Sequence, residues 1–284
     1  MNFKDKLENG KFCFTAELFP PKGTDLSVFK QKAELLKEFI DAFNVTDNQR
    51  AVMRLGGIAV AKTLIDMGIE PIWQLTCRDR NRLALQSDIL AAYVLGIRNI
   101  LIIGGDHPSV GDHKAAMPVY DLDTVQLISV TQGLNSGYDM NGKTLKGKPD
   151  FFIGAVVNPN LEPVDLQLAV MKKKINAGAK FFQSQVCFDP ERIVPFLNLS
   201  RKYNVKFLVS LSLFSTAEQM EQFVTLGIKI PEPLYKRIRG ATSALNESAK
   251  VCSELIKELK TSVDGIHIIA INIEDKIPLI FSSI

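Results

Sequence analysis

The chain has 284 residues, of which 46% are hydrophobic and 23% are charged, and its formal net charge is +3. This composition excludes an intrinsically disordered chain, because disorder goes with low hydrophobicity and high net charge. The balanced charge is also unlike that of a nucleic-acid-binding domain. No apolar run approaches the ~20 residues of a membrane span, and the charged start MNFKDKLENG has no signal-peptide core. We therefore expect a cytoplasmic protein with no nucleic-acid partner and no membrane span.

Residues that bind metals are present but not clustered. The cysteines lie far apart, without a C-x-x-C pair, at Cys13, Cys77, Cys187 and Cys252. This spacing excludes a sequence-local zinc or iron–sulfur cluster and indicates no disulfide framework. Asp106-His107 and Asp112-His113 place imidazoles beside carboxylates, which suits a divalent ion. No third spaced ligand follows, so we predict no metal site.

Strand-like and helix-like segments alternate along the whole chain. The predicted strands are residues 12–19, 42–46, 70–76, 98–104, 151–157, 179–186, 205–212 and 265–271. The segments between them have helical periodicity, as in the stripe formed by Val164, Leu168, Met171 and Ile175. This repeat predicts an α/β fold, a TIM (β/α)8 barrel, in a single domain over residues 1–284. A doubly wound open sheet is the alternative, but it usually has fewer strands, and its glycine-rich first turn is missing.

Helix boundaries are also marked in the sequence. Asp189-Pro190 is an N-cap followed by proline, and Ser215-x-x-Glu218 is a capping box. The helix after that box has an expected apolar face of Met220, Phe223 and Val224. Helices are predicted to end at glycines in the left-handed conformation, at Gly68, Gly96, Gly178 and Gly227. The polar stretch 105–150 predicts a long strand-to-helix loop.

Functional groups of a TIM barrel collect where the strands end. The first predicted strand contains Glu17 among apolar neighbours, and desolvation there favours the protonated form that a general acid needs. An exposed or ion-paired glutamate is the alternative. The next two strands end at Val45-Thr46 and Gln74-Leu75-Thr76-Cys77. Their hydroxyls and amides suit a heterocyclic ligand, or equally the capping of turns.

The later strand ends offer further polar groups. The fourth strand runs into Gly104-Gly105-Asp106, where the backbone can approach a ligand closely. Lys172-Lys173-Lys174 fits either a solvated helix end or contact with a phosphate or carboxylate. Gln185 is expected to be buried, and therefore either bonded within the barrel or aimed at a ligand. His267, in an apolar strand, is interpreted as a core histidine.

Six short motifs occur in a recognisable order. They are Glu17-Leu18-Phe19-Pro20-Pro21; Val45-Thr46; Gln74-Leu75-Thr76-Cys77; Gly96-Ile97-Arg98-Asn99-Ile100 with Gly105-Asp106; Asn176-Ala177-Gly178-Ala179 with Ser184-Gln185 and Phe188-Asp189; and Lys229-Ile230-Pro231. In this order they resemble the methylenetetrahydrofolate reductase family, and the resemblance covers nearly the whole chain. It implies a divergent member of a family of flavin-bearing TIM barrels.

The resemblance also implies residue roles. Glu17 is similar to the family's general acid, which protonates the folate as the five-membered ring of its methylene adduct opens. Asp106 falls on the aspartate beside flavin and pterin, where its charge tunes both. The implied flavin contacts are Thr46, Gln74, Gly104, Gly105, Asp106, Tyr120 and Asn158, with Lys173 and Lys174 beside the phosphates. The implied contacts to pterin or nicotinamide are Gln185, Gln219 and Phe223.

Several positions depart from the family pattern. Gln74 stands where the family usually has a flavin-contacting histidine, and Asn158-Pro159-Asn160 replaces Tyr-Pro-Glu. The segment from Val209 to Leu213 replaces a proline-containing turn. Ile273 takes the place of a folate-binding arginine.

The resemblance implies a flavin-dependent reduction of 5,10-methylenetetrahydrofolate to 5-methyltetrahydrofolate, within one-carbon metabolism and methionine biosynthesis. It implies FAD or FMN as cofactor, and NADH, NADPH or an iron–sulfur partner subunit as electron donor, in a homo- or hetero-oligomer. Two alternatives remain. One is a folate-handling methyltransferase barrel without flavin, and the other is a flavin-binding electron-relay subunit of a larger complex.

Overall fold

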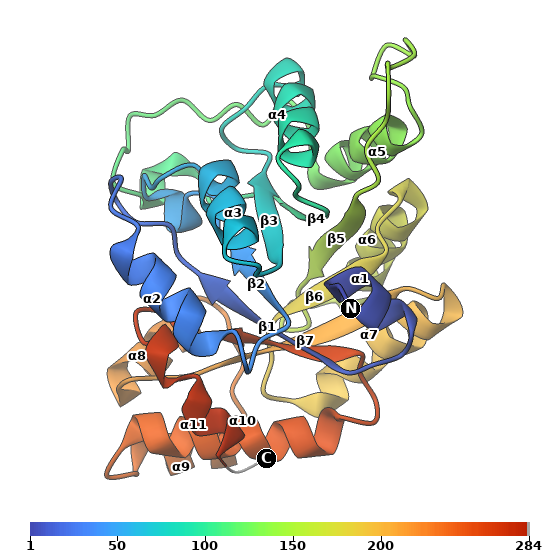
Figure 1. Cartoon of the computed structure of the whole chain (residues 1–284). Coiled ribbons are helices and arrows are strands. Elements are labelled where there is room, and N and C mark those ends of the chain that lie inside the picture. The colour runs from blue at the N-terminus through green and yellow to red at the C-terminus, as the bar shows by residue number, and fades with distance from the viewer. Residues whose placement is uncertain (283–284) are drawn as a thin grey trace.

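The computed structural model describes residues 1–282, and its strands form a closed, all-parallel barrel (Figure 1). The strands are β1 (Cys13–Leu18), β2 (Ala42–Val45), β3 (Pro71–Thr76), β4 (Asn99–Ile103), β5 (Phe152–Val157), β6 (Phe181–Val186), β7 (Lys206–Ser212) and β8 (Gly265–Ile269). Each strand pairs with the next, and β8 pairs with β1 to close the barrel. The TIM barrel prediction is confirmed, and the open-sheet alternative is wrong.

Helices surround the strands, as Figure 1 shows. The α-helices are α1 (Phe3–Glu8), α2 (Ser27–Leu36), α3 (Gly57–Asp66), α4 (Arg82–Val94), α5 (Thr124–Asn135), α6 (Val164–Ala177), α7 (Pro190–Lys202), α8 (Ala217–Thr225), α9 (Glu232–Arg239), α10 (Ala244–Leu259) and α11 (Pro278–Phe281). Three short 3₁₀ turns are η1 (Gln49–Ala51), η2 (Pro108–Val110) and η3 (Glu274–Lys276). Among residues 1–282, no helix has both the length and the apolar character required to cross a membrane.

Two apolar layers hold the barrel together. The larger one lies between the strands and the surrounding helices. The smaller one fills the barrel where the strands begin, and α1 contributes Phe3 and Leu7 to it. The Phe3 ring packs edge to face on Phe181, with ring centroids 5.4 Å apart. Because this end is plugged by hydrophobic side chains, the polar chemistry is confined to the opposite end, where the strands finish.

Most predicted helix boundaries are confirmed. Gly68, Gly96, Gly178 and Gly227 all have positive φ, so each residue has the left-handed conformation expected after a helix. The Asp189 side chain accepts a hydrogen bond from the Glu191 amide at the start of α7. A long loop, residues 104–123, joins β4 to α5 as predicted.

The capping box predicted at Ser215 is wrong by one residue. Thr216 is the N-cap of α8, and its hydroxyl accepts from the Gln219 amide at 3.2 Å. Ser215 instead donates its amide and hydroxyl to the Gln219 Oε1 atom. The prediction that Met220 and Phe223 face the core is confirmed. Val224 is exposed, because it follows Phe223 by one residue and therefore lies about 100° further around the helix.

Candidate active site

A buried carboxylate lies inside the open end of the barrel. Glu17, in β1, is only 7% exposed. Its Oε1 atom accepts a hydrogen bond from Gln74 Nε2 at 3.1 Å, and its Oε2 atom accepts one from Gln49 Nε2 at 3.3 Å. Glu17 was expected to be desolvated, and the structure confirms that it is buried. Gln74, expected as a flavin contact, is a hydrogen-bond partner of Glu17, and Gln49 was not predicted at all.

An imidazole stands on the other side of this carboxylate. His267 Nε2 lies 3.9 Å from Glu17 Oε1, and His267 Nδ1 lies 2.9 Å from Thr15 Oγ1. The Thr15 oxygen also accepts from Gln183 Nε2 at 3.3 Å, so its own proton is available to Nδ1. If Thr15 donates to Nδ1, a neutral imidazole carries its hydrogen on Nε2, the nitrogen that faces Glu17.

The interpretation of His267 as only a core histidine is therefore incomplete. Thr15 and His267 are direct neighbours in the register of β1 and β8, the pair that closes the barrel. Thr15 and Glu17 are two residues apart and so lie on the same face of β1. The sequence signal was this spacing together with the closure of a barrel, which brings the last strand beside the first.

Thr46 lies directly after β2 and is a candidate ligand contact. Its side chain is 1% exposed, and its hydroxyl has no hydrogen-bond partner among the described residues. Buried hydroxyls in folded proteins are almost always paired. The unpaired Thr46 hydroxyl therefore indicates a position where a ligand atom supplies the missing partner.

The loop after β4 carries the next group of predicted residues. Gly105 has a φ of +85°, and a Cβ atom there would lie 3.1 Å from side-chain atoms of Thr76 and Arg78, so the turn requires glycine. Gly104 precedes it with more space around it. Tyr120 donates its hydroxyl to the Gly105 carbonyl at 2.9 Å. Asp106, in the loop that follows β4, is exposed.

The lysine run divides into two environments. Lys172 and Lys173 are exposed on α6, whereas Lys174 is buried and donates its ammonium group to the Val156 carbonyl at 2.7 Å. No carboxylate pairs with Lys174 among residues 1–282. Burial lowers the pKa of this amine below its usual 10.5, because a charged group is poorly solvated there. A buried cation without a counter-ion is the environment expected for binding an anion.

The remaining predicted residues differ in burial and in hydrogen-bond partners. Gln185 was expected to be buried, which is wrong: it is exposed within β6, and Gln183 is the amide bonded inside the barrel. Asn158 accepts from the Asn160 amide in the turn after β5. The Gln219 side chain donates from Nε2 to the Ile271 carbonyl at 3.4 Å.

Phe223 belongs to the core in this structure. Its ring is 9% exposed and packs edge to face against Phe214, with ring centroids 5.2 Å apart. A role in stacking against a pterin or nicotinamide would require the ring to leave this packing.

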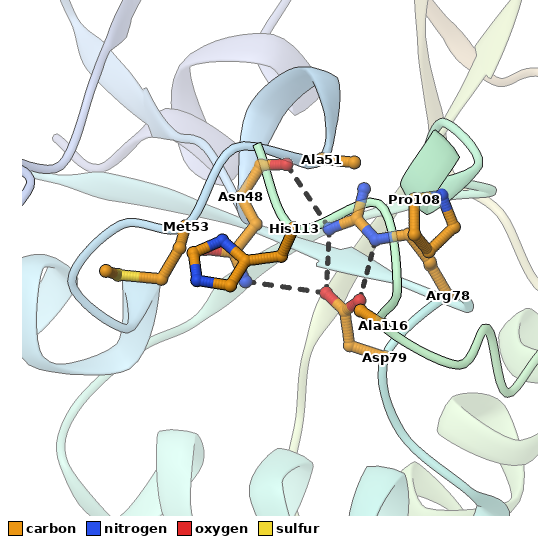
Figure 2. Close-up of a pocket in the computed structure, with 8 residues that line it drawn as sticks. All are labelled: Asn48, Ala51, Met53, Arg78, Asp79, Pro108, His113 and Ala116. Atoms are coloured by element: carbon orange, nitrogen blue, oxygen red, sulfur yellow. Dashed lines mark hydrogen bonds and ion pairs between the residues drawn. The ribbon is translucent and has the colours of Figure 1, made fainter. Parts of the chain in front are cut away.

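Two cavities open among the loops that follow the strands. One, of about 220 Å³, is shown in Figure 2 and is dominated by the ion pair of Arg78 with Asp79, whose Nε–Oδ1 distance is 2.7 Å. Arg78 also donates to the Asn48 carbonyl, so its guanidinium is already satisfied by protein groups. The other cavity, of about 290 Å³, is lined by Thr46 and by Gln49, the residue that holds Glu17. The second cavity is therefore the better candidate for a substrate.

The described residues provide neither a metal cluster nor an activated thiol. Among residues 1–282, no group of three or more His, Cys, Asp or Glu side chains could hold a metal ion. The cysteines are buried and unbridged. Burial raises the pKa of Cys77 to about 12, so its thiol stays protonated and is a poor nucleophile.

Comparison with known proteins identifies the family. The family model described as methylenetetrahydrofolate reductase matches residues 2–284. The chain belongs to the methylenetetrahydrofolate reductase family. The resemblance drawn from the six motifs is thereby confirmed.

Relatives of different lengths match this family member. Methylenetetrahydrofolate reductase 2 of Schizosaccharomyces pombe is 25% identical over 305 residues, which cover 98% of this chain but 46% of the yeast protein. The 5,10-methylenetetrahydrofolate reductase of Buchnera aphidicola is 26% identical over 294 residues, covering 96% of this chain and 93% of the bacterial protein. The chain thus spans less than half of the yeast relative and nearly all of the bacterial one.

A solved structure shares the fold of this family member. It is an uncharacterized protein from Clostridium thermocellum, described as binding two copies of 5-methyl-5,6,7,8-tetrahydrofolic acid. The two chains superpose with a TM-score of 0.68 and 18% sequence identity, covering 98% of this chain and 97% of that one. At this identity the likeness shows the fold alone.

Proposed function

We propose that this protein is an oxidoreductase that reduces 5,10-methylenetetrahydrofolate to 5-methyltetrahydrofolate with the help of a flavin. Family membership supports the reaction, as do the names of bacterial relatives that match over most of their length, those of Buchnera aphidicola and Escherichia coli. The observation that carries the proposal is the buried Glu17 carboxylate, held by two amides at the open end of the barrel. Such a group suits proton transfer to a bound substrate.

The residues present fit a flavin at two points. The unpaired Thr46 hydroxyl can bond a polar atom of the ring system, and the uncompensated Lys174 ammonium can pair with a phosphate. We propose that the loop containing Gly104, Gly105 and Tyr120 also contacts the flavin. Either FAD or FMN meets these requirements. A bound flavin would supply the hydride that reduces the methylene carbon of the folate.

The protein's own side chains then handle the proton and the charge. Glu17 donates a proton to the folate nitrogen that leaves the methylene carbon when the five-membered ring opens. Gln49 and Gln74 keep the Glu17 carboxyl group oriented, and the His267 imidazole faces it, with Nε2 3.9 Å from Oε1. Asp106 at the rim places a negative charge near the cationic folate that results.

The proposed electron donor is NADH or NADPH acting directly. Some relatives carry a matching name, as in methylenetetrahydrofolate reductase (NADH) 1 of Arabidopsis thaliana, which is 25% identical over 213 residues, covering 71% of this chain and 35% of the plant protein. An iron–sulfur partner subunit is the other source of electrons. Gln185, exposed in β6, is the proposed contact to the pterin or nicotinamide.

The function is tested by spectroscopy on the purified chain. After reconstitution with FAD or FMN, we expect visible flavin absorption, bleaching within minutes of anaerobic mixing with NADH or NADPH, and recovery of the colour on adding methylenetetrahydrofolate. If only a chemical reductant or an iron–sulfur protein bleaches the flavin, the direct donor is wrong. If the protein binds 5-methyltetrahydrofolate but no flavin, it is a folate-handling methyltransferase barrel. The ligand described for the Clostridium thermocellum neighbour is also compatible with that function.

Replacing Lys174 by Met separates its binding role from its structural role. We expect FMN affinity to fall by about tenfold or more, because a charge-assisted hydrogen bond to phosphate is lost. Riboflavin, which has no phosphate, should bind both proteins equally. Lys172→Met is the matched control, since Lys172 is exposed on the same helix. Equal loss of FMN and riboflavin affinity would show that Lys174 does not contact a phosphate.

The same variant should change how stability depends on pH. The pKa of Lys174 is lowered in the folded protein, so between that value and 10.5 the unfolded chain binds a proton that the folded chain does not. The free energy of unfolding of the ligand-free protein therefore rises with pH across this range. In Lys174→Met the rise of the unfolding free energy with pH should be smaller. At pH values below this range, the variant should be as stable as the wild type or more stable by roughly 1 kcal/mol. Urea unfolding at a series of alkaline pH values measures both effects.

A further inference from the structure

The larger cavity carries two arginines that the proposed mechanism does not use. Arg50 and Arg54 both line it, together with Thr46, Gln49 and Asn272. Among residues 1–282, neither guanidinium forms an ion pair or a side-chain hydrogen bond, although most arginines near this end do. Two free guanidinium groups on one cavity indicate an anionic ligand, because their fork geometry matches carboxylate and phosphate oxygens.

The loop that holds these arginines is tightly constrained. Asn48, Arg50 and Ala51 all have positive φ, between 48° and 56°, which is uncommon for residues other than glycine. Such a conformation costs of order 1–3 kcal/mol per residue and persists only where the surroundings impose it. Here the Asn48 side chain accepts from the Arg54 amide at 2.9 Å, and Arg78 donates to the Asn48 carbonyl at 3.2 Å.

The loop between β4 and α5 packs against the same turn. Gly111 lies so close to Ala51 that an added Cβ would come within 1.9 Å of the Ala51 carbonyl oxygen. The loop from β4 to α5 therefore packs directly on the turn. Arg50 and Arg54 are held on a rigid support, as a binding site requires.

The rest of the cavity wall is mainly apolar and indicates that the ligand also has an apolar part. Phe19, Val52, Val110 and Ile271 provide apolar surface beside the two cations. A ligand that fits both parts has a flat apolar group that ends in one or more anions. The cavity also reaches Gln49, whose side chain donates to Glu17. A molecule with its reacting end at Glu17 can therefore extend its anionic end toward the arginines.

From these observations we infer that Arg50 and Arg54 bind the carboxylates of the p-aminobenzoyl-glutamate tail of the folate, with the benzoyl ring against Phe19 and Ile271. This inference rests on the proposed function. The tail has the required order of groups, an aromatic ring followed by carboxylates. A phosphate of the flavin or nicotinamide shares the anionic chemistry, and titration with FMN and riboflavin distinguishes this source.

The test compares ligands with and without the tail. Isothermal titration calorimetry measures the affinities of 5-methyltetrahydrofolate and of the tail-less 6-methyltetrahydropterin. The proteins compared are the wild type, Arg50→Gln, Arg54→Gln and the double variant. We expect the affinity of the double variant for 5-methyltetrahydrofolate to fall by about tenfold or more, because two charged hydrogen-bond donors are removed. Its affinity for the tail-less pterin should equal that of the wild type. Arg201→Gln, on α7 at the opposite end of the barrel, is the matched control.

Each other outcome overturns the inference in a distinguishable way. Unchanged affinity of the double variant for 5-methyltetrahydrofolate would remove the arginines from the folate site and leave the proposed function intact. A loss for FMN but not for riboflavin, with folate affinity kept, would assign them to a phosphate. A wild-type protein that binds neither folate nor pterin would overturn the proposed function, and the inference with it. Thermal unfolding of each variant excludes a folding defect.

Discussion

Replacing Glu17 by Gln is expected to slow the reduction of methylenetetrahydrofolate by about 100-fold or more. The amide has nearly the shape of the carboxyl group but cannot deliver a proton, and loss of one general acid typically costs this much. Flavin reduction by the electron donor should stay near its normal rate, because that half-reaction needs no proton from Glu17. Anaerobic stopped-flow measurement of the two half-reactions separates these effects.

Two further variants sharpen this experiment. Glu274→Gln is the matched control, since Glu274 is also a buried glutamate but is paired with Lys32 at 2.6 Å and does not contact Glu17. It should leave both half-reactions unchanged. His267→Asn should lower the rate of the folate half-reaction by about tenfold, since the imidazole that faces Glu17 at 3.9 Å is lost. A Glu17→Gln protein that reduces the folate at the wild-type rate would remove Glu17 from the mechanism.

Replacing Gly265 by Ala is expected to destabilise the barrel by about 3 kcal/mol or more. Gly265 is the first residue of β8, and an added Cβ would lie 2.3 Å from the Cys13 carbonyl oxygen in β1. The obstacle is backbone, so the two strands would have to separate at the seam where the barrel closes. Overpacking against a side chain usually costs 1–3 kcal/mol, and a backbone atom has less freedom to move away.

The matched control for this prediction is Gly56→Ala. Gly56 has a φ of −56°, which alanine adopts freely, and no atom lies within 4 Å of the position of its added Cβ. The Gly56→Ala variant should be as stable as the wild type or slightly more stable, because alanine has less conformational freedom than glycine in the unfolded chain. Urea unfolding of the two variants gives the difference. A Gly265→Ala protein as stable as the wild type would show that the seam can widen at no cost.

The order of strands and helices could be determined from the sequence because each element carries its own local signals. All of the predicted strands occur in the structure within about two residues of their expected bounds. Glycines at 68, 96, 178 and 227 end helices because the left-handed conformation they require is a property of the residue itself. The one-residue error at Ser215 arose because Ser215 and Thr216 both have a side chain that can cap a helix.

The sequence also identified the strand ends that carry the candidate site, since in a parallel barrel the carboxyl ends of the strands all lie at one end. For Glu17 the sequence left a buried and an exposed carboxylate open, and the structure shows the buried one. The exposure of Gln185, which was expected to be buried, shows the limit of this reasoning. Barrel strands are buried on both faces, so alternation along β6 does not reveal which glutamine is bonded inside the barrel.

Only the tertiary structure decided which of these side chains meet. His267 reaches Glu17 because β8 pairs with β1, and Thr15 and His267 are 252 residues apart in the chain. The burial of Lys174, which distinguishes it from Lys172 and Lys173, depends on how α6 lies against β5. Arg50 and Arg54 share a cavity with Ile271 because loops from opposite ends of the chain meet at the same barrel mouth. Contacts of this kind depend on long-range pairing and packing, whereas local propensity acts only on neighbouring residues.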